Sequence, residues 1–325
     1  MAYPLGTPFS GTAPATPYSG TFIPEIWSAK LIEKFYDATV LAAISNTNYE
    51  GEIKKHGDKV KMRQRPTVTI RDYSANQALV VDRPSATIIE MNIDKGKYFN
   101  VHLDDVMKVQ SDIDLMNEWS SDASEQFKIE IDRIVLLSMV NGATARNRGT
   151  GAGRISLNIN LGVAGTPVTI TRTNVMDYIV LLGQALDEQN IPETGRYIVI
   201  PAWFSSLLKR SDLRDASLTG DGTSVARNGR LGMIDRFTLY SSNLLPNSTT
   251  DGVGGNDADA ATYIYAGHKN GLTFASQLTE MEVIRSEQTF GNLMRGLQVW
   301  GQQIIDSTAI AQLYAKPDAT AGSPV

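Results

Sequence analysis

The sequence has 325 residues, 42% of them hydrophobic, which allows a sizeable buried core divided over about two domains. It contains no cysteine, so disulfide bonds and thiolate metal sites are excluded. A formal net charge of −5 argues against a general nucleic-acid binder, which is usually basic. No apolar run reaches the roughly 18 residues of a membrane span, and the N-terminal residues do not resemble a signal peptide.

The first residues, MAYPLGTPFSGTAPATPYSG, are rich in Pro, Gly, Thr and Ser. This composition suits either an extended arm that orders against a partner or a disordered tail, and composition alone does not decide between them. A helical pattern follows from Phe22 to Ile44, with Pro24 near its start. We expect this helix to anchor the arm. Its candidate buried positions are Ile26, Leu31, Phe35 and Leu41.

The next segment, KVKMRQRPTVTIRDY from Lys59 to Tyr73, alternates basic and apolar side chains, which is typical of a strand with two different faces. Pro66 marks an edge or a bulge. The basic positions are Lys59, Lys61, Arg63 and Arg65, and the apolar positions are Val60, Met62, Val68 and Ile70.

A second strand pattern, from Thr87 to Leu103 with a break at Lys95 and Gly96, completes a predicted hairpin whose tip is SANQALVVDRPS. Each arm of about 15 residues would be roughly 50 Å long. An isolated two-stranded ribbon is marginally stable in water, so we expect the hairpin to lie on another surface. If that surface belongs to a neighbouring copy, the protein is an assembly subunit. The apolar face of the second strand is Ile89, Met91, Ile93, Phe99, Val101 and Leu103.

The strongest helix pattern runs from Asp112 or Asp114 to Asn141, where the dipeptide Asn-Gly suits a left-handed C-cap. About 28 residues span roughly 42 Å, a length more typical of a structural spine than of a ligand platform. The positions on its predicted buried face are Met116, Trp119, Ala123, Phe127, Ile131, Ile134 and Ser138.

The second half of the chain mixes helix and strand patterns, which predicts an α+β fold. A helix is expected from Thr171 to Gln189, with Thr173 as a possible N-cap. A buried strand from Tyr197 to Ile200 turns at Pro201 into a short helix, and FTLYSSNLL forms another strand. From Thr262 onward the pattern is mostly strands with one helix-like turn. The buried face of the helix from Thr171 is Val175, Ile179, Leu182 and Leu186.

No motif predicts catalysis, a cofactor or a metal ion. His56, His102 and His268 have no metal-ligand spacing, and His102 with Asp104 and Asp105 is better explained as a strand end beside solvated acids. Two glycine-rich stretches, GTGAG and GDG, lack the strand, helix and Gly-Lys-Ser/Thr context of a phosphate loop. No Gly-x-Ser-x-Gly elbow indicates a hydrolase.

Charge is distributed unevenly along the chain. The segment Glu52–Arg71 has a net charge of +5, and Asp104–Asp132 has a net charge of −7. The basic strand lacks the interleaved aromatic residues of a single-strand nucleic-acid groove, so it is either a solvated face or a contact between subunits. The candidate subunit-contact residues are Lys59, Lys61, Arg63, Arg65, Glu118, Asp122 and Glu125.

The order of these parts resembles the major capsid proteins of tailed bacteriophages, which have the Hong Kong 97-like fold. Two stretches carry the resemblance most specifically. LDEQNIPETGRYIVIPAWFSSLL resembles the helix, proline turn and central strand of the family's A-domain, and GRLGMIDRFTLYSSNLLP resembles the segment that follows its inner loop. The closing residues, from Gly271 to Tyr314, resemble the last strands of the P-domain.

The resemblance implies six parts. They are an N-terminal arm (1–22), a helix and connection of the P-domain (23–51), an extended E-loop hairpin (52–103), the P-domain with its spine helix (104–165), an A-domain (166–274), and P-domain return strands with a C-terminal tail (275–325). The two-faced strand would then belong to the E-loop and lie across an adjacent subunit. Some members of the family cross-link through an E-loop lysine, but Lys95 and Lys97 lie away from the hairpin tip and are not assigned that chemistry.

The resemblance also implies a function. The protein would be a virion component without cofactors that assembles with itself, in the host cytoplasm, into pentamers and hexamers of an icosahedral head around double-stranded DNA. Further partners would be a portal and a separate scaffolding protein, because no segment of about 100 residues precedes the arm. Alternatives are another phage structural subunit, such as a decoration, portal-associated or tail-tube protein, or a hydrolase.

Overall fold

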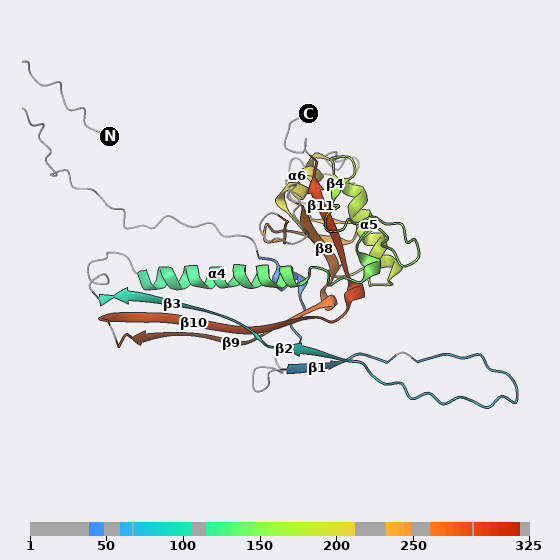
Figure 1. Cartoon of the computed structure of the whole chain (residues 1–325), viewed down its shortest axis with the longest axis horizontal. Coiled ribbons are helices and arrows are strands. Elements are labelled where there is room, and N and C mark those ends of the chain that lie inside the picture. Colours follow the sequence, from blue (N-terminus) through green and yellow to red (C-terminus); the bar gives the residue numbers. More distant parts are fainter. Residues whose placement is uncertain are drawn as a thin grey trace, which may run out of the picture.

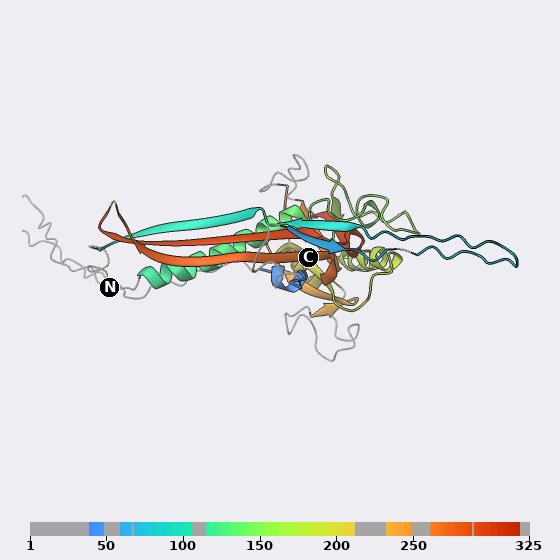
Figure 2. The same cartoon turned by 90° about the horizontal axis from the view of Figure 1, so that it is seen from below.

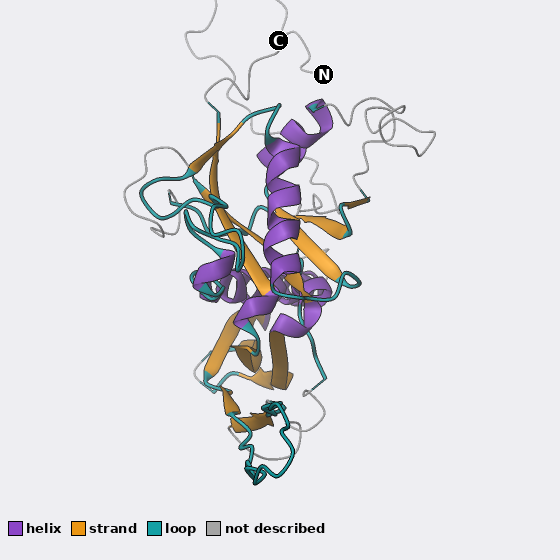
Figure 3. Cartoon of the chain, turned by 90° about the vertical axis from the view of Figure 1, so that its right-hand side faces the viewer, coloured by secondary structure: helices purple, strands orange, loops and turns teal. Residues whose placement is uncertain are grey.

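The computed structural model has a mixed α+β architecture with three separate sheets (Figure 1). The predicted N-terminal arm and most of the predicted helix from Phe22 lie outside the described residues, and α1 (Leu41–Ile44) is the part of that helix that is described. Figure 3 shows the helices and strands of the described part of the chain, coloured purple and orange. The structure describes residues 39–48, 59–66, 68–105, 115–211, 232–248, 261–287 and 289–318.

One half of the molecule is a long three-stranded antiparallel sheet in the order β3-β10-β9, with one long helix packed along it. The strands are β3 (Lys95–Asp104), β9 (Leu272–Arg285) and β10 (Gly291–Ile304), and the helix is α4 (Leu115–Ser138). They run side by side in two perpendicular views (Figures 1 and 2). Asn141 has the positive φ expected of it, 62°, but α4 ends at Ser138, so Asn141 lies in the turn after the helix and the predicted C-cap position is wrong by about three residues.

The other half is a six-stranded sheet in the order β4-β11-β8-β5-β7-β6, flanked by α5 (Val175–Glu188) and α6 (Ala202–Arg210). Its helix α5 begins after Asn174, so the predicted N-cap at Thr173 is wrong by one residue.

The remaining elements are short 3-10 turns and the strands of the six-stranded sheet. The 3-10 turns are η1 (Ala145–Asn147), η3 (Lys269–Gly271) and η4 (Ser307–Ala309). The strands are β4 (Val168–Ile170), β5 (Arg196–Ile200), β6 (Met233–Ile234), β7 (Phe237–Ser241), β8 (Thr262–His268) and β11 (Ile310–Pro317).

The central strands of the six-stranded sheet, β5 and β8, are buried on both faces, and the core on one of these faces joins the two halves. All five residues of β5 are buried. Ile198 and Ile200 pack with α5 and α6 in one core cluster, whereas Tyr197 and Val199 belong to a second cluster with the C-terminal part of α4 and Trp300 of β10. Such two-sided burial explains why residues 197–200 of this strand are continuously apolar rather than alternating.

The predicted hairpin is shorter than expected. Its paired part is the ribbon of β1 (Lys59–Arg63) and β2 (Ile88–Asn92). Beyond the bond from the Gln64 N–H to the Thr87 carbonyl, the two limbs run on without strand pairing. We call these limbs, residues 64–66 and 68–87, the open tip. It projects beyond the rest of the described chain at the right of Figure 1.

The base of the ribbon lies on its own chain. Met62 and Met91 are buried against Ala275 of β9, in a third core cluster that includes Ile93. The alternation predicted for Lys59 to Arg63 is confirmed, with Val60 and Met62 turned inward and the basic residues exposed. Val68 and Ile70, expected to continue the apolar face, are exposed, because no other described segment covers the open tip.

Two stretches fold into sheets that the sequence did not predict. The stretch Thr87 to Leu103 divides into two strands in different sheets, because β10 is long enough to pair with all ten residues of β3. Near the C-terminus, β11 lies in the six-stranded sheet between β8 and β4, whereas the resemblance implies that it belongs with the closing strands of the other half.

Candidate interaction surfaces

The predicted basic face is exposed along β1. The side chains of Lys59, Lys61 and Arg63 point away from the core, and Arg65 continues the exposed stretch beyond the strand. Lys61 forms an ion pair of 3.2 Å with Glu90 on the partner strand. Because both side chains are largely solvated, this pair contributes only about 0 to 1 kcal/mol and leaves the face available for other contacts.

The predicted acidic positions follow the outer half of α4. Glu118 is exposed, Asp122 is half-buried, and Glu125 accepts a hydrogen bond of 2.6 Å from Lys128 on the same helix. In a single chain these acids lie far along α4 from β1 (Figure 1), so the structure does not bring the two predicted sets together. Contact between them therefore requires a second copy.

One member of the acidic segment is not a surface group. Asp132 is fully buried in α4, and one of its carboxylate oxygens accepts a hydrogen bond of 2.8 Å from the Val40 N–H. Burial raises the pKa of Asp132 to about 6, and the backbone N–H groups of Val40 and Leu41 act in the opposite direction. The carboxylate therefore ties the end of the N-terminal segment to the long helix.

A groove lies between α4 and β3 on the outer half of the three-stranded sheet. Its aromatic floor includes Phe99 and Phe127, whose ring centroids are 5.4 Å apart, together with Trp119. The volume is about 510 Å³. Charged groups stand at its rim, where Lys97 donates a hydrogen bond of 3.0 Å to Glu130. We call it the α4–β3 groove.

The open tip exposes a second apolar surface, which sequence reasoning missed. Leu79, Val80 and Val81 are all exposed on one limb, and Val68 and Ile70 are exposed on the other. Arg71 and Asp82 form a 2.9 Å ion pair that joins the two limbs. The signal was present in the sequence as an apolar run of three residues inside an otherwise polar loop.

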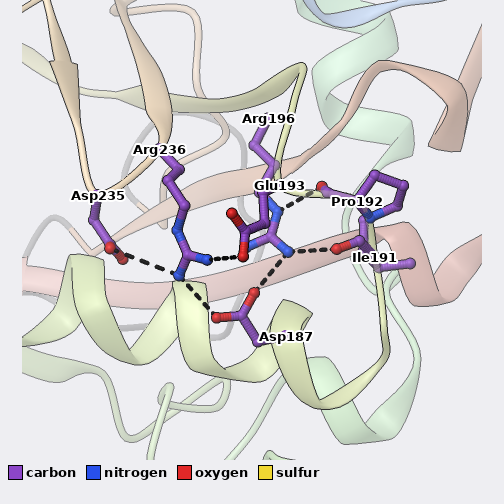
Figure 4. Close-up of polar contacts among 7 residues, drawn as sticks. All are labelled: Asp187, Ile191, Pro192, Glu193, Arg196, Asp235 and Arg236. Atoms are coloured by element: carbon purple, nitrogen blue, oxygen red, sulfur yellow. Dashed lines mark hydrogen bonds and ion pairs between the residues drawn. The ribbon is translucent and has the colours of Figure 1, made fainter.

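A cluster of charged side chains around the buried Arg196 fixes one edge of the six-stranded sheet (Figure 4). The fully buried Arg196 lies 2.7 Å from Asp187 at the end of α5 and donates hydrogen bonds to the carbonyls of Ile191 and Pro192. Arg236, in the turn between β6 and β7, pairs with the same Asp187 at 2.9 Å. The cluster holds this turn against α5 and has the character of a structural network rather than a ligand site.

Among the described residues, no group of three or more His, Asp or Glu side chains is placed to hold a metal ion. His102 lies 2.8 Å from the Thr289 hydroxyl, and Asp105 pairs with Arg285. His56 lies outside the described residues. No described helix is both long and apolar enough to cross a membrane.

Comparison with known proteins gives consistent matches. A family model described as phage capsid protein matches residues 86–322. A solved structure from Mycobacterium phage Che8 is 25% identical, with a TM-score of 0.70, covering 90% of this chain and 97% of that chain. A capsid structure of Cyanophage P-SCSP1u is 15% identical, with a TM-score of 0.70, covering 91% and 94%. No curated protein matches the chain.

Another similar structure is the mature capsid of bacteriophage PhiM1, which is 14% identical with a TM-score of 0.66 and covers 97% of this chain and 99% of that one. The fold therefore defines a structural protein of the phage head rather than an enzyme. The chain belongs to the phage capsid protein family, and as a major capsid protein it is a component of the virion. The resemblance to tailed-phage major capsid proteins that the sequence indicated is confirmed, and the alternatives of a tail subunit or a hydrolase are set aside.

Proposed function

We propose that this chain forms the pentamers and hexamers of an icosahedral head that encloses double-stranded DNA. The observation that carries the proposal is the match of a phage capsid family model to residues 86–322, together with structural similarity to two phage capsid structures over at least nine-tenths of the chain. A projecting open tip and exposed apolar groove suit a subunit that completes its packing in an assembly.

We also propose how the parts of the capsid fold map onto this chain. The N-terminal arm (1–22) and its connection (23–51) precede an E-loop that ends near Asn92, because β3 pairs with β10. The P-domain consists of β3, α4, β9 and β10. The A-domain is the six-stranded sheet with α5 and α6, and it includes β11.

Further partners follow from the same proposal. A portal and a separate scaffolding protein would act during assembly in the host cytoplasm. The packaged DNA would be enclosed without sequence-specific binding, and the net charge of −5 argues against the chain being a general DNA binder.

The predicted contact residues remain part of this proposal. We expect the basic face of Lys59, Lys61, Arg63 and Arg65 to meet acidic surface of a neighbouring subunit, with Glu118, Asp122 and Glu125 as the leading candidates. Complementary charge of this kind favours encounter and register more than affinity.

Electron microscopy of the expressed protein tests the proposed function. Expression alone, and together with the other structural proteins of its phage, should yield closed shells of uniform diameter built from five-fold and six-fold rings. Stacked rings or tubes without closed shells in every condition would overturn the proposal, as would a chain that stays monomeric in all of them.

A further inference from the structure

A short segment, residues 39–48, connects the first 38 residues of the chain to the rest of the molecule, and we call it the strap. Near one end, the Val40 N–H donates a hydrogen bond of 2.8 Å to Asp132 of α4. Near the other end, the Asn46 N–H donates a hydrogen bond of 2.8 Å to the Leu272 carbonyl of β9. The strap therefore joins the long helix to the three-stranded sheet.

The strap has few buried contacts between these two anchors. Its buried apolar side chains are Val40 and Ile44, which join the core cluster formed by the C-terminal part of α4. Thr39, Ala42 and Thr47 are exposed. Segments with few buried apolar contacts open locally at a lower free energy than the core does. The state of the Asp132 anchor can therefore decide how often the strap opens.

Asp132 is a buried carboxylate with an incomplete set of hydrogen bonds. Its Oδ2 atom accepts from the Val40 N–H, whereas Oδ1 has no hydrogen-bond partner among the described residues. An ionised carboxylate can accept several hydrogen bonds, and burial without them is costly. On α4, the neighbouring Lys128 and Arg133 are exposed, so Asp132 lies at the edge of the buried face with the strap packed against it. Opening of the strap would return the carboxylate to water.

The groups packed around Asp132 supply no charge that offsets its burial. The strap, residues 272–275 of β9 and residues 300–304 of β10 contain no Asp, Glu, Lys, Arg or His. On α4, Lys128 already pairs with Glu125 at 2.6 Å. Phenol groups are uncharged at neutral and acidic pH, and burial raises the pKa of Tyr197 and Tyr265 further. The tyrosines of the cluster are Tyr197, Tyr240, Tyr263, Tyr265 and Tyr314.

We propose that Asp132 is a proton-dependent latch for the strap: the protonated carboxyl keeps the strap docked on α4, and ionisation favours a locally open state in which the carboxylate is solvated. The pKa of Asp132 is about 6 in the docked state, against an ordinary value of 3.8, so opening releases a proton between these pH values. The docked state is favoured most at low pH and loses up to tenfold in population ratio per pH unit through this window. The latch thus sets how firmly the first 38 residues are anchored, in a single subunit and without any shell.

Hydrogen exchange of the full-length subunit at pH 5 and pH 7 tests the latch, with rates corrected for the intrinsic effect of pH. The reporting amides are those of Ile44, Ser45 and Asn46, which are hydrogen-bonded in the docked state. We expect their protection to be about tenfold lower at pH 7 than at pH 5. At both pH values it should lie below the protection of β5, because the strap opens without unfolding of the core.

Three variants separate the latch from simple packing. Asp132→Asn keeps an oxygen that can accept from the Val40 N–H but cannot ionise, so strap protection should be nearly equal at the two pH values. Glu118→Gln, an exposed position on the same helix, is the matched control and should keep the tenfold difference. Ile44→Ala removes apolar contact and no charge, so it should lower strap protection at both pH values and leave their ratio unchanged.

Three results would overturn the inference. One is wild-type strap protection that is the same at pH 5 and pH 7, and this measurement decides the question even if Asp132→Asn does not fold. Another is a tenfold difference that persists in Asp132→Asn, which would assign the proton to a different group. The third is strap protection equal to that of β5 at both pH values, because the strap would then open only when the whole subunit unfolds.

Discussion

At the scale of single residues, Asp132 determines how one part of the molecule responds to pH. Its pKa in the folded chain is about 6, above the ordinary carboxyl value of 3.8, because burial disfavours the charged form. The folded state therefore holds a proton that the unfolded chain has already released between pH 4 and pH 6. Stability should fall as the pH rises through this window, by at most about 1.4 kcal/mol per pH unit.

The variant Asp132→Asn tests this prediction, because it removes the charge and keeps an oxygen that can accept from the Val40 N–H. Urea unfolding at pH 4.5, 5.5 and 6.5 should show a smaller loss of stability with rising pH for the variant than for the wild type. Glu118→Gln, at an exposed position on the same helix, is the matched control and should keep the wild-type slope. An unchanged slope in Asp132→Asn would show that other groups cause the pH dependence.

At the scale of elements, the ribbon and its open tip should differ in local stability. The ribbon buries Met62 and Met91 against its own chain, whereas the open tip exposes its apolar residues and has no ladder of hydrogen bonds. Segments that bury little cannot offset the entropy lost on ordering. In hydrogen exchange of the free subunit, we expect protection of amides in β1 and β2 and rapid exchange over residues 68–86. In assembled shells, the tip should become protected.

The strand β5 is a suitable internal reference for that experiment, since all its residues are buried. If the tip is already as protected in the free subunit as in the shell, it is supported within its own chain. Sequence reasoning alone predicts weak order for the whole segment from Lys59 to Tyr73, and the structure limits this expectation to the part beyond Gln64.

At the scale of the whole molecule, charge should influence the rate of assembly. Reversal of Lys59, Lys61 and Arg63 to Glu removes the basic face of β1, and we expect slower assembly at low salt with a nearly unchanged melting temperature of the subunit. The melting temperature should change little because exposed ion pairs contribute only about 0 to 1 kcal/mol each to stability. The effect on the assembly rate should appear at low salt because charge–charge interactions between subunits are screened beyond about 8 Å at physiological salt. Light scattering at several salt concentrations measures the effect.

A matched triple reversal of Arg146, Arg154 and Arg172 to Glu changes the net charge equally at exposed positions in the other half of the molecule. It should slow assembly less than the β1 variant does. Partial rescue by Lys at Glu118, Asp122 and Glu125 would support direct pairing. If both triple reversals assemble equally fast, the basic face of β1 is only a solvated surface.

The sequence by itself determined the features that depend on local periodicity. The two-faced alternation of β1, the long helix α4, the buried strand β5 and its turn into α6 could all be predicted, because side-chain spacing within a segment decides which residues face a core. The order of these elements along the chain also carried the resemblance to phage capsid proteins.

Only the tertiary structure decided which strands became neighbours. Strand pairing is made between segments far apart in sequence, and an apolar alternation does not specify its partner, so β3 and β11 could not be assigned to their sheets in advance. The same limit applies to Asp132, which reads as one more surface acid until the Val40 segment packs over it. The α4–β3 groove likewise could not be predicted, because it forms where α4 and β3 pack together and no local sequence pattern indicates that these two elements are neighbours.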